Sequence, residues 1–181
     1  KGANSVAGNT VLGESALDDS VSGGNNTAIG KGTLTANTSG NNNTALGKDA
    51  LEITTTGAYN VAVGANSLDT NTSGNNNTGI GYSSLDSNTT AANNTAVGFQ
   101  SLLVNTTGTQ NTAVGANALD SNTTANNNTA VGYLSLGANT TGTPNTAVGA
   151  NALAANTTGN NNSAFGKDAL NDNTDGDENS A

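Results

Sequence analysis

The chain has no cysteine, histidine, methionine or tryptophan, and phenylalanine and tyrosine together make up 3% of its 181 residues. Without cysteine no disulfide supports the fold, which is compatible with an extracellular solenoid. Without histidine or cysteine little is left for catalysis, and the acidic residues are scattered rather than paired as glycosidase chemistry requires. We therefore predict that the protein is not an enzyme, and the shortage of large side chains excludes a globular core of the ordinary type.

Basic residues and long apolar runs are also scarce. Four lysines and arginines stand against 13 acidic residues, and the formal net charge of −9 argues against nucleic acid as a partner. No apolar run approaches the ~18 residues that span a bilayer, so we expect no membrane insertion. The chain starts at Lys1 without a signal peptide, and we expect a processed product or an excerpt of something longer.

What the sequence does contain is a 17-residue repeat, present ten times without an insertion or deletion. A glycine, here called the key glycine, is followed four residues later by leucine and preceded four residues earlier by asparagine. The key glycines are Gly13, Gly30, Gly47, Gly64, Gly81, Gly98, Gly115, Gly132, Gly149 and Gly166. A fixed short period indicates copies stacked in register, which is the signature of a solenoid.

The residues before each key glycine carry the strand signal. They are rich in Thr, Val and Ile, as in residues 60–63, and turn-forming residues bound them. We predict an all-β fold, a parallel β-solenoid (β-roll) of about ten 17-residue coils that forms a rod about 48 Å long. Residues 1–8 are predicted as a shortened N-terminal coil, 9–178 as the ten-coil solenoid and 179–181 as the start of a further repeat.

Two kinds of inward column are predicted. Alternation along the strand favours an inward position for the apolar residue before the key glycine, together with the repeated leucine. The predicted core therefore includes Val63, Val97, Val114, Val131, Val148, Leu68, Leu85, Leu102, Leu119 and Leu153. Stacked asparagines are predicted to form hydrogen-bonded ladders at Asn60, Asn77, Asn94, Asn111 and Asn128, and at Asn71, Asn88, Asn122 and Asn139. The glycine ten residues after most key glycines is expected to have positive φ.

Two ligand hypotheses follow from polar side chains. The C-terminal loop spaces oxygen ligands around Gly176 as a calcium loop does, which makes Asn171, Asn173, Asp175 and Asp177 a candidate calcium site; a plain solvated terminus is the alternative. No other cofactor is expected. Residues seven and nine after the key glycine, such as Asn122 with Thr124 and Asn139 with Thr141, would point to one face if extended. Stacked over the coils they would form a flat Asn/Thr grid suited to binding ice.

Two segments carry a family resemblance. Asn-Val-Ala-Val-Gly at 60–64 and Asn-Ser-Val-Ala-Gly at 4–8 resemble the repeat of the head domain of trimeric autotransporter adhesins. The longer pattern Asn-Thr-Ala-Val-Gly-Ala-Asn-Ala-Leu followed by Asn-Thr-Thr-Gly-Asn-Asn is similar to repeat arrays of bacterial and phage tail-fibre-like proteins. The resemblance implies a left-handed β-roll, three chains side by side, and a fibre shaft or surface adhesin.

From these observations we expect a structural fibre or filament subunit, or shaft, at a cell or virion surface, extracellular and with an adhesive role. The expected partners are copies of the chain itself, as a trimer or a head-to-tail filament, and a host-surface or glycan receptor. Head-to-tail stacking is suggested because residues 179–181 begin a unit that Lys1–Gly2 of a following molecule would continue. The alternative function is an ice-binding solenoid that presents the Asn/Thr grid.

Overall fold

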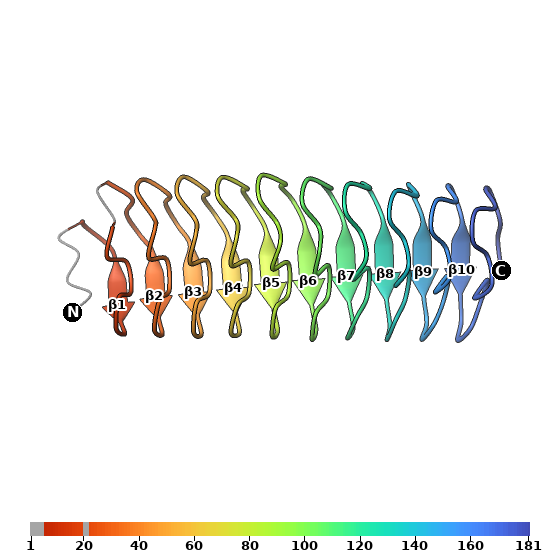
Figure 1. The fold of residues 1–181 in the computed structure, drawn as a ribbon, viewed down its shortest axis with the longest axis horizontal. Helices are drawn as coiled ribbons and strands as arrows, with labels where there is room; N and C mark the ends of the chain where they lie inside the picture. The colour runs from red at the N-terminus through yellow and green to blue at the C-terminus, as the bar shows by residue number, and fades with distance from the viewer. Residues whose placement is uncertain (1–5, 20–21) are drawn as a thin grey trace.

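The computed structural model describes residues 6–19 and 22–181 and contains ten three-residue β-strands. The strands are β1 (Thr10–Leu12), β2 (Thr27–Ile29), β3 (Thr44–Leu46), β4 (Val61–Val63), β5 (Thr78–Ile80), β6 (Thr95–Val97), β7 (Thr112–Val114), β8 (Thr129–Val131), β9 (Thr146–Val148) and β10 (Ser163–Phe165). They form one parallel sheet in sequence order, and each strand pairs with the next at a shift of 17 residues. Each repeat is thus one coil of a β-solenoid, and the coils line up along a rod (Figure 1).

Pairing between coils continues outside the strands. The turn residue Leu68 donates its backbone N–H to Ser84 O at 3.0 Å, and Thr70 donates to Asp86 O at 3.1 Å. At the C-terminal end, Ser180 forms a parallel bridge with Ser163, so residues 179–181 extend the sheet beyond β10. Of the predicted shortened coil 1–8, residues 1–5 lie outside the described residues, as does Ser20, where the second asparagine column is interrupted.

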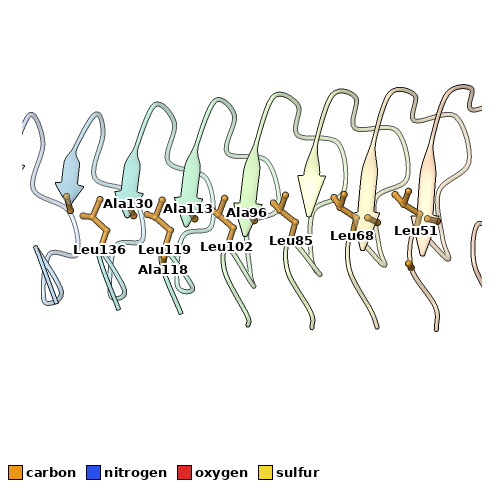
Figure 2. Close-up of a cluster of buried hydrophobic side chains, with 14 of the residues drawn as sticks. Leu51, Leu68, Leu85, Ala96, Leu102, Ala113, Ala118, Leu119, Ala130 and Leu136 are labelled. Carbon is orange, nitrogen blue, oxygen red and sulfur yellow. The ribbon is translucent and has the colours of Figure 1, made fainter. Parts of the chain in front are cut away.

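The core of each coil is small. The middle residue of each strand points inward, and it is alanine in eight of the ten strands. These alanines pack against the repeated leucine, whose side chains form a continuous row along the rod (Figure 2). Leu68, Leu85, Leu102, Leu119 and Leu153 are all completely buried.

The aliphatic residue before the key glycine is not in the core, which corrects the sequence prediction for five valines. Val63, Val97, Val131 and Val148 are partly exposed and Val114 is 37% exposed, whereas the alanine before each of them is completely buried. Successive side chains of a strand point to opposite faces, so only one parity can face inward. The inward position holds alanine or glycine in nine of the ten strands, with Val11 in β1 as the exception, and the larger side chain of each of these nine strands is directed outward.

The glycines fulfil two different requirements. Key glycines such as Gly98 have φ of 141°, and a Cβ there would overlap the carbonyl oxygen of the key glycine in the next coil. The expectation of positive φ for the glycine ten residues after the key glycine is wrong. At Gly40 a Cβ would instead overlap Gly57 O and Asn37 Oδ1, so close approach is what excludes a side chain. The left-handed residue of this turn is Asn42, with φ of 57°.

Candidate interaction surface

The outward side of the sheet is a flat surface made of two columns of side chains, here called the Thr/Val face. One column holds the first residue of each strand, which is Thr in eight strands, Val61 in β4 and Ser163 in β10. The other holds the last residue: Leu12, Ile29, Leu46, Val63, Ile80, Val97, Val114, Val131, Val148 and Phe165. Neither column contains a charged residue.

The second column is apolar in every coil, although five of its ten residues are exposed and the other five are half-buried. Leu12 is 68% exposed, Phe165 63% and Ile80 39%. Parallel pairing at a shift of 17 residues places these side chains at the strand spacing of about 4.8 Å. The Thr/Val face is therefore a regular, uncharged surface along the whole rod. Sequence reasoning missed it because it placed the same residues in the core.

A second row, here called the edge row, follows the sheet where the strands end. It holds the residue directly after each key glycine: Glu14, Lys31, Lys48, Ala65, Tyr82, Phe99, Ala116, Tyr133, Ala150 and Lys167. Tyr82 and Phe99 stack with ring centroids 5.6 Å apart and an interplanar angle of 15°, and both are 51% exposed. Lys31 Nζ lies 3.1 Å from Glu14 Oε2. Three of the four basic residues of the chain lie in this row.

Both predicted asparagine columns lie inside the rod. In the first, each asparagine accepts from the next coil and donates to a turn carbonyl: Asn77 N donates to Asn60 Oδ1 at 2.9 Å, and Asn60 Nδ2 donates to Gly74 O at 2.9 Å. The same pattern includes Asn94, Asn111 and Asn128. Each side chain thus satisfies backbone groups of two coils that would otherwise be buried without partners.

In the second column the amides bond directly to one another. Asn88 Nδ2 donates to Asn71 Oδ1 at 2.8 Å, and Asn139 Nδ2 donates to Asn122 Oδ1 at 3.1 Å. Thr54 occupies this column one coil before Asn71, is completely buried, and its Oγ1 finds no hydrogen-bond partner among the described residues. The chain of amides is therefore broken at Thr54.

Burial of the second column also removes the Asn/Thr grid that was considered for ice binding. Asn122 and Asn139 are completely buried, whereas Thr124 and Thr141 are exposed. The intervening backbone does not run as an extended strand, so residues seven and nine of the coil do not share a face. The predicted grid is thus not a surface of this molecule.

Acidic side chains stack on one turn. Glu52, Asp69 and Asp86 occupy the same position in three consecutive coils. Burial raises the pKa of Asp69 to about 6, and the charges of Glu52 and Asp86 add to the shift. Burial also raises the pKa of Asp86. Asp69 Oδ1 is buried without a hydrogen-bond partner in the described part of the chain.

In the C-terminal loop, two residues of the candidate calcium site already serve the coil stack. Asn173 Nδ2 donates to Asn156 Oδ1 at 2.8 Å, and Asp177 Oδ1 accepts from Asn160 N at 2.6 Å. Asn171 is half-buried and Asp175 is exposed. Across residues 6–19 and 22–181, no three acidic, histidine or cysteine side chains gather as metal ligands would. The calcium site stays a prediction.

Comparisons with family models, curated proteins and solved structures found no match to this chain. Residues 6–19 and 22–181 contain no helix long and apolar enough to cross a membrane.

Proposed function

We propose that this chain is a structural shaft, a spacer within a fibre or filament at a cell or virion surface. The observation that carries the proposal is the register: nine successive strand pairings all join residues 17 apart, so each repeat adds one equal coil. Length is then set by the number of repeats at about 4.8 Å per coil. A protein whose length is set by its number of repeats is suited to hold the domains or molecules at its two ends a fixed distance apart.

The bonds between coils support a mechanical role for the rod. Neighbouring coils are joined by strand ladders, by turn hydrogen bonds and by buried asparagines in two columns, of which the second is interrupted at Thr54. Any added coil, from the same chain or from another copy, would extend the same ladders. An adhesive role and a host-surface or glycan receptor remain part of the proposal through the family resemblance.

Distance measurements on shortened rods test the proposal. Asp19 and Asp172 are exposed and occupy the same position of the first and tenth coils, about 43 Å apart by strand spacing. We would label Asp19→Cys/Asp172→Cys with a fluorescent donor and acceptor and then delete residues 99–115. The label distance should shorten by about 4.8 Å, and by the same step for a second deleted repeat, with the β-sheet circular-dichroism spectrum retained.

The matched control deletes residues 99–106, which removes half a repeat and breaks the register. This variant should lose its cooperative melt. If removal of a whole repeat unfolds the rod, or leaves the label distance unchanged, repeats are not independent length units and the shaft proposal fails.

A further inference from the structure

The apolar column of the Thr/Val face lies outside the buried core of the coils that carry it. The core already consists of the inward alanines, the leucine row and the asparagine ladders. Even so, all ten coils place an aliphatic or aromatic residue outward at the same position. Ten strands of about 10 Å length at about 4.8 Å spacing give a flat area of about 480 Å². The apolar column is a contiguous part of this area, and contiguous apolar patches of a few hundred Å² on soluble proteins are often interaction sites.

We propose that the Thr/Val face packs against the Thr/Val face of a second copy of this chain, with the two rods antiparallel. Two sheets that meet face to face lie about 10 Å apart with their outward side chains interdigitated. The two faces together cover about 960 Å² as flat projections, without the edge rows, which is close to the roughly 1,000 Å² at which specific interfaces begin.

Charge complementarity selects the antiparallel arrangement. A two-fold axis along the strand direction places the edge row of one rod against the reversed edge row of the other. Coil one then faces coil ten, so Glu14 lies opposite Lys167 of the second copy. In the middle of the rod, Tyr82 lies opposite Phe99 of the second copy, and both aromatic rings are exposed for this contact.

The remaining pairs follow the same two-fold arrangement. Lys48 lies opposite Tyr133, which suits a cation–π contact. On the Thr/Val face, Leu46 lies opposite Val131, so a larger side chain meets a smaller one. Parallel rods would instead place the edge row against the opposite edge of the partner sheet, where the one charged residue among Asn25 and its equivalents is Glu178, one coil beyond the position opposite Lys167.

This inference is independent of the shaft function: pairing concerns the side of the rod, and spacing concerns its length. Light scattering coupled to size exclusion measures the pairing directly. The chain should have about twice its mass of 17.5 kDa, and Val97→Lys/Val114→Lys should halve the measured mass by placing charges in the middle of the face. The control Thr107→Lys/Thr124→Lys adds the same charge at exposed turn positions and should leave the mass unchanged.

Cross-linking tests the orientation, because the chain has no cysteine of its own. Leu12 and Phe165 lie nine strands apart in one chain, about 43 Å, so a disulfide between them must join two molecules. Oxidation of a mixture of Leu12→Cys and Phe165→Cys chains should give a covalent heterodimer, and either variant alone should not cross-link. Cross-linking of Leu12→Cys with itself would overturn the antiparallel arrangement.

Three results overturn the pairing itself. One is a monomer of 17.5 kDa at all concentrations, including a monomer that inhibits ice recrystallisation through the same face. The second is a trimer mass. The third is a dimer that survives Val97→Lys/Val114→Lys with an intact circular-dichroism spectrum.

Discussion

At the scale of the residue, asparagine has the role that large apolar side chains have in a globular core. An amide carries two N–H donors, so one buried side chain can donate both to the coil before it and to a turn carbonyl of its own coil. Asn105 does both: its Nδ2 lies 3.1 Å from Asn88 Oδ1 and 2.9 Å from Gly108 O. Narrow coils are thus joined by hydrogen bonds where little apolar area is available.

Thr54 gives the test of this role. Its hydroxyl is buried and unpaired in the described structure, and the amide chain is broken on both sides of it. Thr54→Asn should raise stability by about 1 kcal/mol or more, because it removes an unsatisfied group and adds amide bonds to Asn37 and Asn71. Thermal and urea melts measure the change. Thr54→Val should gain less, and Thr56→Asn, at an exposed position of the same turn, should gain nothing.

The acidic stack predicts a pH dependence of stability. The pKa of Asp69 rises from 3.8 to about 6 on folding, so the folded state binds its proton more tightly than the unfolded chain does. Stability from this group is therefore fully present below pH ~4 and is lost as the pH rises to ~6. Asp69→Asn should remove this loss and be more stable than the natural chain at pH 7.

Urea unfolding from pH 4 to 7 gives the comparison. The difference between Asp69→Asn and the natural chain should grow between pH 4 and 6 and then stay constant. Asp120→Asn is the control. Asp120 occupies the same position of its coil, but its neighbours in the column are the uncharged Leu103 and Gly137. Equal behaviour of the two variants would contradict a role for the Glu52–Asp69–Asp86 stack.

At the scale of the element, the repeat predicts where each strand lies, and the structure confirms the parallel solenoid. The residues before Gly64 form β4, as the Thr/Val/Ile content indicates. Which side of the strand faces inward was predicted wrongly, because hydrophobicity favours burial of Val63 over Ala62. The decisive quantity is the space between the strand and Leu68, which depends on how tightly the turns close the coil. The small residue in the middle of nearly every strand was the available signal.

Close stacking of the strand ends predicts the effect of a methyl group at the key glycine. Gly98 and Gly166 have similar φ values of 141° and 129°, so alanine is strained at both. A Cβ at Gly98 would overlap Gly115 O, whereas at Gly166 no described atom lies within 4 Å of it. Gly98→Ala should therefore lower the melting temperature more than Gly166→Ala. The difference between the two melts isolates the contact from the backbone strain, and equal losses would mean that φ alone requires glycine.

At the scale of the whole molecule, contacts between strands reach only from one coil to the next. The strand order β1 to β10 is the sequence order, and within residues 6–19 and 22–181 no contact joins strands that are not neighbours. The stability of such a chain is approximately the sum of the intrinsic stabilities of its coils and of the interfaces between neighbouring coils. How far the effect of a destabilising substitution extends therefore depends on how close the substituted coil is to an end of the rod. The outward surface does not enter this sum, which explains why the repeat predicts the rod, whereas the Thr/Val face is found only in the structure.

The same leucine-to-alanine substitution should therefore have different consequences in the middle of the rod and near its end. Leu102 and Leu153 are both completely buried, and truncation of either to alanine should cost about 2–5 kcal/mol locally. Hydrogen exchange measured by mass spectrometry should show that Leu153→Ala lowers protection mainly in residues 149–181, where few neighbouring coils remain to hold the end. Leu102→Ala should lower protection in coils on both sides of residue 102. Leu103→Ala, at the adjacent half-buried position, should leave the exchange pattern of the natural chain. A uniform loss of protection along the rod in both core variants would show that all coils unfold as one unit, and the nearest-neighbour description would then be wrong.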